Sequence, residues 1–385
     1  MKAGPGGERA AVATAGAAVK TMSVFLFASG RYKDRVADAP VQKRLSLDLV
    51  LGPIEDMTEK AHPAVMSSKP PLRIVLCAPR GFCAGVVRAI DVVETALKIH
   101  GPPVYVRHEI VHNKYVVDSL KAKGVVFIKE LSEAPSGPAP VIFSAHGVAR
   151  SVPEEAERRG LYTIDATCPL VTKVHREAQA HFKRGRRILL IGHAGHPEVV
   201  GTMGQLPPGA VTLVSDVAEV ERLEIEPGVD LAYVTQTTLS VGETREVIAA
   251  LKARFPQIAN PPVEDICYAT TNRQEAIQQA AKLVEAVIVV GAANSSNSQR
   301  LREAAEREGL AIAVLAPDVD AIDWKRFEGV RSLAITAGAS APEVLVERIL
   351  DGFAERFDIS VETLTTTAES MFFPLPRALR EAATP

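Results

Sequence analysis

The sequence predicts an α/β fold with parallel sheets, and three observations support this prediction. Apolar runs of strand length alternate with amphipathic runs of helix length along most of the chain. Polar loops separate each strand from the helix that follows it, an order typical of parallel sheets. A strand–cysteine–helix junction occurs at positions 83, 168 and 267, which lie 85 and 99 residues apart. Such separations match the length of a small α/β unit, so we expect three similar units, each offering one cysteine.

Length and composition exclude several classes of protein. A chain of 385 residues exceeds one ordinary hydrophobic core, so two or three domains are expected. The 47% hydrophobic and 23% charged residues are typical of soluble globular proteins. A net charge of −2 gives no reason to expect a nucleic-acid or anionic-membrane partner. No apolar run reaches the roughly 20 residues of a membrane helix, so we expect a cytoplasmic protein.

Residues 1–70 differ from the rest of the chain. They are rich in alanine, glycine and charge, contain four prolines between positions 40 and 70, and show no sustained periodicity. The short apolar run at 23–30 lacks a clean cleavage pattern and is followed by RYKDR, which argues against a secretory signal. We expect a disordered leader, or an over-extended start with translation from Met57 or Met66. A transit peptide is the remaining alternative.

From position 73 the elements follow one another regularly. Strands are expected in apolar runs that end in a polar or glycine-containing loop, the last two continuing into helices: 73–81, 103–109, 124–128, 140–147, 162–168, 187–198, 210–215, 231–238, 286–308 and 332–350. Separate amphipathic helices are expected at 85–101, 113–124, 169–185, 243–256 and 267–285. In parallel sheets of this kind, active-site loops lie at the carboxyl ends of the strands.

Three of the four cysteines lie beside the expected amino termini of helices. Cys83 is in a glycine-containing loop, Cys168 precedes a proline suited to the first helical position, and Cys267 shortly precedes a helix. Unpaired N–H groups and the helix dipole favour a thiolate at such places. Cys77, in contrast, falls inside an apolar strand, so we expect it to be a buried core residue.

The capping residues of two of these helices can also be predicted. Thr167 is suited to cap the helix that follows Cys168, and Thr271 or Asn272 is suited to cap the helix that follows Cys267.

The three cysteines point to iron–sulfur chemistry. Four scattered cysteines are too few for a disulfide scaffold in a chain of this size. Thiolates bind soft metals and iron–sulfur clusters, and three of them can hold three irons of a cubane while the fourth iron remains open. For each cysteine alone, a packed loop residue is the plainer interpretation. Three cysteines at matching junctions weaken that interpretation.

Hydroxyl-rich and histidine-containing loops follow several of the expected strands. They lie at 144–148, 192–198, 235–240, 294–300 and 336–343. Serine, asparagine and glycine at helix starts can bind phosphate through hydroxyl and N–H groups, although ordinary capping explains each loop singly. A threonine in 235–240 can orient a substrate hydroxyl or a water. No Walker pattern and no G-x-G-x-x-G is present, so nucleotide binding is not supported.

The segment HEIVHN at 108–113 matches the zinc-protease pattern H-E-x-x-H. That pattern requires both histidines on one face of a helix. Here the segment follows a strand, and the next helix is expected to begin near His112 or Asn113. We therefore interpret the match as coincidental and keep a zinc hydrolase only as an alternative.

A series of motifs from about Leu72 to Leu350 closely resembles the 4-hydroxy-3-methylbut-2-enyl diphosphate reductase family, the last step of the non-mevalonate isoprenoid pathway. The motifs that carry the resemblance are GFCAGVVRAI, YVRHEIVHNKYVVDSL, FSAHGV, DATCPLVTKVH, IGHAGHPEVVGTMGQ, TQTTLSV, DICYATTNRQEA, NSSNSQRL and TAGASAP. They are long, nearly gapless and in the family's order. Only the leader is uncharacteristic.

The resemblance implies a pseudo-threefold trefoil of α/β units around a central 4Fe–4S cluster, one per chain, with an open iron site. The implied reaction is the reductive dehydroxylation of 4-hydroxy-3-methylbut-2-enyl diphosphate to isopentenyl and dimethylallyl diphosphate. Two electrons pass through the cluster from ferredoxin or flavodoxin, and an NADPH-dependent reductase supplies these electrons to the donor protein. The expected division is a leader at 1–70, a strand and cluster loop at 71–84 that joins the third unit, units at 85–167, 168–264 and 265–352, and a C-terminal tail at 353–385.

The resemblance also implies a role for individual residues. Cys83, Cys168 and Cys267 are the implied cluster ligands. Glu198 is the implied proton source, with Thr237 as its partner around the substrate hydroxyl. The implied diphosphate-binding residues are His112, His146, His196, Ser295, Ser296, Asn297 and Ser340. A cluster-bearing sensor without turnover is the remaining alternative from another class.

Overall fold

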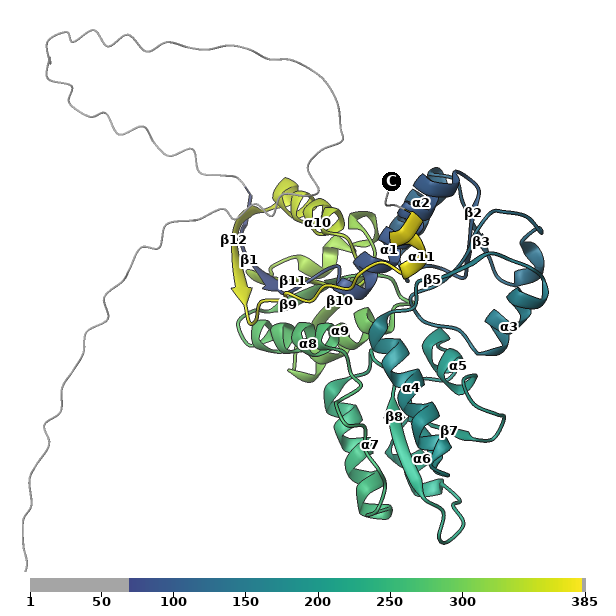
Figure 1. Cartoon of the computed structure of the whole chain (residues 1–385). Coiled ribbons are helices and arrows are strands. Elements are labelled where there is room, and N and C mark those ends of the chain that lie inside the picture. The colour runs from purple at the N-terminus through teal and green to yellow at the C-terminus, as the bar shows by residue number, and fades with distance from the viewer. Residues whose placement is uncertain (1–68, 383–385) are drawn as a thin grey trace, which may run out of the picture. The chain divides into compact units, whose positions relative to one another are not determined.

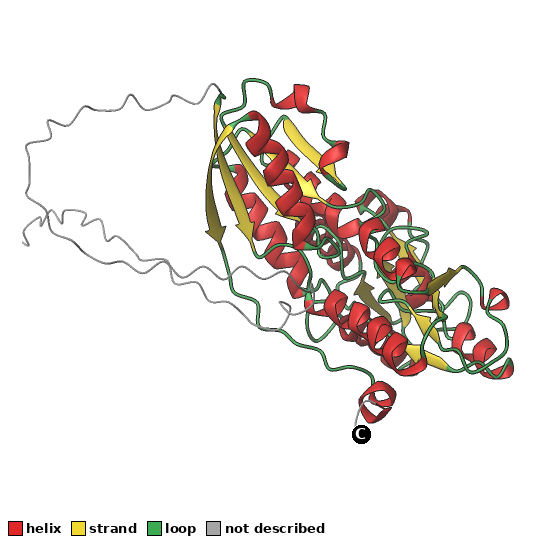
Figure 2. Cartoon of the chain, turned by 90° about the horizontal axis from the view of Figure 1, so that it is seen from above, coloured by secondary structure: helices red, strands yellow, loops and turns green. Residues whose placement is uncertain are grey.

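The computed structural model describes residues 69–382, and the leader expected at 1–70 therefore lies almost entirely outside the described residues. The described chain forms three sheets in which every strand pair is parallel (Figure 1). Helices follow most of the strands, as Figure 2 shows. The predicted α/β fold with three parallel-sheet units is confirmed.

The largest sheet has five strands in the order β10-β9-β11-β1-β12. Its strands are β1 (Pro71–Ala78), β9 (Ala286–Val290), β10 (Ile312–Ala316), β11 (Ser332–Ala337) and β12 (Asp358–Thr365). The first described strand, β1, is paired with β11 from Arg73↔Ser332 onward, although more than 250 residues separate them along the chain. The chain thus returns to its described start, and the loop after β1 lies beside the loops after β9 and β11.

The two smaller sheets are built from consecutive segments. The four-stranded sheet has the order β3-β2-β4-β5, with β2 (Val104–Arg107), β3 (Val125–Ile128), β4 (Val141–Phe143) and β5 (Thr163–Asp165). The three-stranded sheet has the order β7-β6-β8, with β6 (Arg187–Ile191), β7 (Val211–Val214) and β8 (Leu231–Thr235). The central strand β6 and the neighbouring strand β8 are almost entirely buried, which explains their continuous apolar sequence.

The helices cover the faces of these sheets. They are α1 (Ala84–His100), α2 (Lys114–Ala122), α3 (Ser151–Arg158), α4 (Pro169–Lys183), α5 (Pro197–Met203), α6 (Val217–Arg222), α7 (Val241–Arg254), α8 (Tyr268–Ala281), α9 (Ser296–Arg307), α10 (Glu343–Arg356) and α11 (Arg377–Ala382). Short 3₁₀ turns η1 (Leu131–Glu133), η2 (Val319–Ala321) and η3 (Trp324–Phe327) complete the list. No helix within residues 69–382 is both long and apolar enough to cross a membrane.

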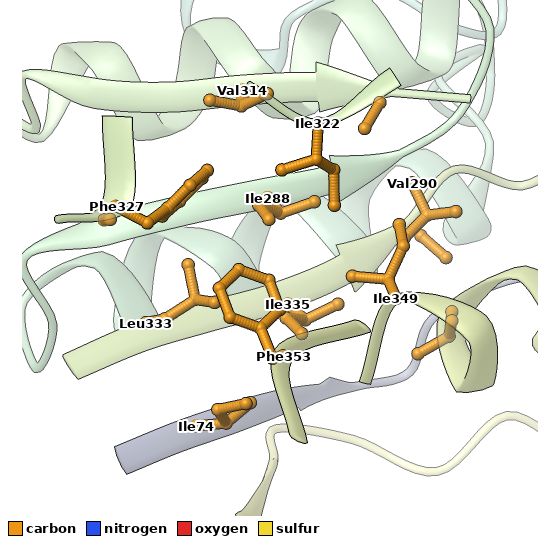
Figure 3. Packing of buried hydrophobic residues seen from close by; sticks show 14 of the residues in the cluster. Ile74, Ile288, Val290, Val314, Ile322, Phe327, Leu333, Ile335, Ile349 and Phe353 are labelled. Carbon is orange, nitrogen blue, oxygen red and sulfur yellow. The ribbon is translucent and has the colours of Figure 1, made fainter. Parts of the chain in front are cut away.

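Figure 3 shows the core on one face of the five-stranded sheet. Ile288 and Ile335 project from the sheet toward Ile349 and Phe353 of α10, and these side chains are fully buried. Phe353 and Phe327 meet edge to face at 5.4 Å between ring centroids. Burying an aliphatic or aromatic side chain contributes roughly 1.5–3 kcal/mol, so this layer fixes α10 against the sheet.

The three helices that follow the cysteines connect one sheet to the next. Helix α1 follows β1 but packs on the four-stranded sheet, where Ala89 and Val92 contact the same cluster as Val106. Helix α4 follows β5 but packs on the three-stranded sheet. Helix α8 comes after the three-stranded sheet and packs on the five-stranded sheet. The three connections therefore form a closed cycle, and each cysteine lies where the chain passes between sheets.

Apart from the short 3₁₀ turns, six elements were not predicted from the sequence: α3, α5, α6, β10, β12 and α11. Strand β12 pairs with β1 over eight residues, and most of its side chains are exposed. An edge strand of this kind lacks the hydrophobic pattern that reveals buried strands. After β12 the chain crosses to α11, which packs on α1 (Figure 1). Leu379 of α11 is fully buried in the core of the four-stranded sheet.

Candidate active site

The loops at the carboxyl ends of the parallel strands surround one cavity. Apolar cavities into which a few polar side chains converge are typical sites for a small-molecule ligand or cofactor. All twelve site residues expected from the sequence line this cavity: Cys83, His112, His146, Cys168, His196, Glu198, Thr237, Cys267, Ser295, Ser296, Asn297 and Ser340. They come from all three sheets, so only the tertiary fold brings them together.

Each of the three cysteines is the N-cap residue of a helix: Cys83 of α1, Cys168 of α4 and Cys267 of α8. The predicted caps Thr167, Thr271 and Asn272 are therefore wrong. Helix α8 begins at Tyr268, before both predicted caps, because the Cys267 sulfur itself accepts the Thr270 N–H at 3.4 Å. The prediction that the cysteines lie at helix amino termini is confirmed.

The backbone of each cysteine is tied to a neighbouring strand loop. The amide of Cys83 donates to the Ala339 carbonyl at 3.3 Å, and that of Cys168 donates to the Ala145 carbonyl at 3.0 Å. The amide of Cys267 donates to the Thr237 carbonyl at 3.0 Å. The same arrangement thus occurs three times, and it fixes each cysteine beside a loop that also carries a candidate substrate residue.

The three partly buried thiols interact electrostatically. Burial raises the pKa of the Cys168 thiol to about 12 and that of the Cys267 thiol to about 11, and the nearby Cys83 adds to both shifts. The effect of burial on these thiol pKa values therefore exceeds the opposite effect of the helix termini, which were expected to favour thiolates. A group that keeps these sulfurs deprotonated must supply positive charge, as iron does.

The space beside the sulfurs depends on one glycine. A Cβ atom on Gly85 would lie 2.7 Å from the Cys168 sulfur and 3.8 Å from the Cys83 sulfur. Both sulfurs therefore face the same small volume at the start of α1. A donor set of three thiols around one cavity fits an iron–sulfur cluster, which cysteine thiolates bind. Within residues 69–382, no three His, Cys, Asp or Glu side chains are arranged to hold a single metal ion.

The segment HEIVHN lies in a loop between β2 and α2, with His108 at a φ of 60°. His108 and His112 therefore do not share a helix face, as the zinc motif requires. The interpretation of this match as coincidental is confirmed by the local backbone.

Three histidine rings form a cluster in the cavity. The rings of His112 and His146 stack at 4.2 Å between centroids, and His196 lies 5.8 Å and 6.0 Å from them. Burial, together with the neighbouring rings, lowers the pKa of His196 to about 4 and that of His146 well below its usual range. Without a bound anion these two rings are neutral at pH 7.

The described hydrogen bonds of these histidines engage Nδ1. That atom faces Glu109 Oε2 at 3.0 Å in His112 and Ser144 Oγ at 3.3 Å in His146, while in His196 it accepts the Glu198 N–H at 3.2 Å. His112 Nε2 is buried with no hydrogen-bond partner. A buried polar atom without a partner is costly, so this nitrogen is suited to bind a ligand.

Glu198 and Thr237 form a buried pair. Glu198 Oε1 accepts the Thr237 N–H at 2.7 Å, and Oε2 accepts the Thr237 hydroxyl at 3.0 Å. Glu198 is only 3% exposed. Burial raises its pKa from 4.5 to about 7, although both bonds from Thr237 act in the opposite direction. The carboxyl group is therefore partly protonated near neutral pH.

The remaining candidates surround the amino terminus of α9. Ser295 is its N-cap residue and accepts the Ser298 N–H, so Ser296 and Asn297 occupy the first helical turn. Ser340 lies opposite and donates its hydroxyl to the His112 carbonyl at 3.0 Å. Exposed N–H groups and the helix dipole at such a terminus favour an anion.

Several residues that were not expected from the sequence also line the cavity. Thr238 follows Thr237, and Tyr268 and Thr270 lie in the first turn after Cys267. The Tyr268 hydroxyl accepts the Ala84 N–H at 3.2 Å, and the Thr270 hydroxyl lies 3.2 Å from the Cys267 sulfur. Proximity to the cysteine was a usable signal for these two. Phe373 comes from the C-terminal segment, where no local pattern indicates a site.

Comparison with known proteins agrees with this geometry. The family model described as LytB protein matches residues 74–354. The relative named 4-hydroxy-3-methylbut-2-enyl diphosphate reductase 2 from Rhodopseudomonas palustris is 64% identical over 318 residues, which cover 83% of this chain and 99% of the relative. The relative named 4-hydroxy-3-methylbut-2-enyl diphosphate reductase 1 from Bradyrhizobium diazoefficiens is 65% identical over 319 residues, with coverage of 83% and 99%.

A solved structure shows the same likeness. The E-1-hydroxy-2-methyl-but-2-enyl-4-diphosphate reductase from Plasmodium falciparum has a TM-score of 0.78 and 37% sequence identity, and the match covers 81% of this chain and 98% of that one. The match to the family model includes strands of all three sheets and all twelve site residues expected from the sequence. The chain belongs to the LytB protein family.

Proposed function

We propose that this chain reduces 4-hydroxy-3-methylbut-2-enyl diphosphate to isopentenyl and dimethylallyl diphosphate, as the names of its relatives imply. The reaction consumes two electrons and two protons. One proton leaves with the hydroxyl group as water, and the other is added at one of two carbon positions, which gives two products.

One observation carries the proposal. A single cavity brings together three thiols, three histidines and the buried pair of Glu198 and Thr237. Each group matches one requirement of the reaction: a redox cofactor, a site for an anion and a source of protons. Apolar side chains such as Val86, Val111 and Phe373 also line the cavity and suit the hydrocarbon part of the substrate.

Cys83, Cys168 and Cys267 would hold the cofactor. A 4Fe–4S cluster bound by these three thiolates supplies one-electron transfers and a Lewis-acidic iron that has no protein ligand. Ferredoxin or flavodoxin, reduced by an NADPH-dependent reductase in the cytoplasm, is the proposed source of the electrons.

The diphosphate is proposed to bind between the histidine cluster and the start of α9. His112, His146 and His196 are close enough to contact one anion together. An anion favours protonated imidazoles, so diphosphate binding would raise the lowered pKa values of His146 and His196. The remaining proposed contacts are hydroxyl, amide and N–H groups of Ser295, Ser296, Asn297 and Ser340.

Glu198 is the proposed proton source. Its Oε1 is held by the Thr237 N–H, so in the protonated form the proton would reside on Oε2, and the hydrogen bond with the Thr237 hydroxyl would then reverse its direction. The Thr237 hydroxyl can accept that proton and donate its own toward the cavity, which would place a donor beside the leaving hydroxyl group of the substrate.

Anaerobic purification followed by measurement of iron, sulfide and turnover tests the proposal. We expect iron and sulfide together, and oxidation of a reduced viologen dye that depends on the hydroxylated diphosphate. Zinc without sulfide would support a hydrolase instead. Iron and sulfide without any substrate-dependent oxidation of the dye would support a sensor and contradict the proposed enzyme.

A further inference from the structure

A basic residue follows each of the three cysteines at nearly the same distance along its helix. Arg88 and Lys173 lie five residues after Cys83 and Cys168, and Arg273 lies six residues after Cys267. Each side chain reaches away from its own cysteine to the loop that precedes a different cysteine, as the following contacts show.

Arg88 lies on α1, which begins after Cys83. Its Nη1 donates to the Ala166 carbonyl at 3.2 Å and to the Thr167 carbonyl at 3.0 Å. These are the two residues directly before Cys168. Its Nε donates to the Pro374 carbonyl in the C-terminal segment at 2.9 Å. Arg88 therefore joins the helix of Cys83 to the loop of Cys168.

Lys173 makes the corresponding connection from α4, which begins after Cys168. Its Nζ donates to the carbonyls of Val263 and Glu264 at 2.7 Å and 3.2 Å, and to Asp265 Oδ1 at 2.8 Å. These three residues lie shortly before Cys267. The Asp265 side chain is fully buried, and its other oxygen accepts the Thr235 N–H at 2.9 Å.

Arg273 completes the cycle from α8, which begins after Cys267. Its Nε and Nη2 donate to the Gly81 carbonyl at 3.2 Å and 2.8 Å. Gly81 lies two residues before Cys83. The guanidinium group is fully buried and is paired with Glu369 of the C-terminal segment at 2.9 Å.

We infer that Arg88, Lys173 and Arg273 are positioning residues that fix the three cysteines around the cavity in a closed cycle. Each cation links the helix that enters one α/β unit to the loop that leaves it, so each sets the span between two cysteines. Charge-assisted bonds to backbone carbonyls restrain a loop more strongly than neutral bonds do. The inference rests on the proposed function only in taking the cysteines as cluster ligands.

The cycle has a physical consequence for cluster retention. Three thiols at separate helix termini must be held together for one group to bind all of them, and ordering loops costs conformational entropy. The three cations hold the cysteine loops in place in the folded protein, so these loops are already ordered before a cluster binds. Loss of one cation frees one loop, so the cysteine of that loop dissociates from the bound group more often.

Arg88→Gln is the decisive variant, because the described hydrogen bonds of Arg88 all go to backbone carbonyls. The charge of Arg88 also acts on Asp165 and Cys168, and the Arg88→Lys variant preserves that charge. Lys98→Gln is the matched control: Lys98 lies exposed on the same helix, and the change in charge is the same. Arg88→Lys, which keeps a cation at this position, tests rescue.

The measurements are iron and sulfide per chain after anaerobic reconstitution, and the rate at which a chelator bleaches the cluster absorbance. Loss of charge-assisted bonds should accelerate bleaching in Arg88→Gln by about tenfold or more. Lys98→Gln should match the parent protein, and Arg88→Lys should fall between them. The unfolding transition of each variant, recorded in parallel, separates loss of the cluster from loss of the fold.

Unchanged bleaching in a folded Arg88→Gln protein would overturn the inference. Should that variant not fold, Lys173→Gln compared with Arg176→Gln makes the same comparison on α4, because Arg176 is exposed on that helix. Equal bleaching of this pair would overturn the inference as well. A parent protein without iron and sulfide would instead contradict the proposed function, so the two failures are distinguishable.

Discussion

Glu198 combines burial with two hydrogen bonds from a single threonine. Glu198→Gln preserves the shape of the side chain but removes the transferable proton. We expect turnover to fall by roughly 10²–10⁴-fold, while cluster absorbance and substrate binding remain. Single-turnover kinetics in anaerobic solution measure the loss. Glu303→Gln is the control, because burial also raises the pKa of Glu303 but its side chain does not line the cavity.

The raised pKa of Glu198 also predicts how turnover depends on pH. Only the protonated carboxyl donates, and with a pKa of about 7 its population falls roughly tenfold for each pH unit above that value. We therefore expect kcat to decline as pH rises through 7. The residual activity of Glu198→Gln should lack this decline. A parent profile that stays flat to pH 9 would contradict the assignment.

The raised pKa of Glu198 also determines how its contribution to the stability of the fold depends on pH. The folded protein binds this proton more tightly than the unfolded chain, because burial penalises the carboxylate. The contribution of Glu198 to stability is thus complete below about pH 4.5, the ordinary value, and is lost as pH rises through 7.

The cysteines differ in what their sulfur does. Cys168→Ser keeps a good N-cap residue at the start of α4 but removes a thiolate ligand. We expect the variant to fold and to lose most of its iron and sulfide. Cys77→Ala should show the opposite pattern, with normal iron and a loss of stability on the order of 1 kcal/mol, because Cys77 is buried in β1. Metal analysis together with chemical denaturation checks both.

At the scale of the helix, replacing Gly85 should affect the stability of α1 and the binding of iron in different ways. Alanine favours a helix over glycine by up to about 1 kcal/mol, and Gly85 has no positive φ. Its Cβ, however, would lie 2.7 Å from the Cys168 sulfur. Gly85→Ala should therefore leave the thermal transition unchanged or raised while iron content falls.

Gly242→Ala is the control for this prediction. Gly242 is also the second residue of its helix, and its added Cβ would lie 3.4 Å from Arg307 Nη1 and 4.0 Å from Ser240 Oγ, which are ordinary contacts. This variant should keep its iron. Normal iron content in Gly85→Ala would show that the space beside the sulfurs is not needed.

Most helices and buried strands could be predicted because their signals are local. Helix α1 shows the apolar periodicity of its buried face, and β6 shows a continuous apolar run. The caps of α4 and α8 were mispredicted because threonine and asparagine are the stronger caps in isolation. In the fold, the amides of Cys168 and Cys267 are held by neighbouring loops, which fixes where each helix begins.

At the scale of the whole molecule, the C-terminal segment joins two units. It runs from β12 in the five-stranded sheet to α11 beside α1 (Figure 1), and it brings Phe373 to the cavity. Glu369 anchors its middle to Arg273, whose side chain is 1% exposed. Glu369→Ala leaves a buried cation without its carboxylate, and we expect a loss of about 3 kcal/mol in chemical denaturation.

Glu362→Ala is the matched control in the same C-terminal part of the chain. Glu362 is paired with Arg73, but both side chains are about half exposed, so the expected loss is below about 1 kcal/mol. Equal losses from the two variants would show that the Arg273 pair is no more important than a surface pair.

The sequence by itself determined the α/β class, the junctions at Cys83, Cys168 and Cys267 and, by resemblance, a set of twelve residues that the fold gathers in one cavity. These features depend on short stretches of chain whose periodicity and composition are visible locally. Only the tertiary structure decided that β12 completes a sheet, that Phe373 reaches the cavity and that Arg88 and Arg273 hold loops of other units. Such contacts join residues far apart in the chain, and packing selects them without leaving a local pattern.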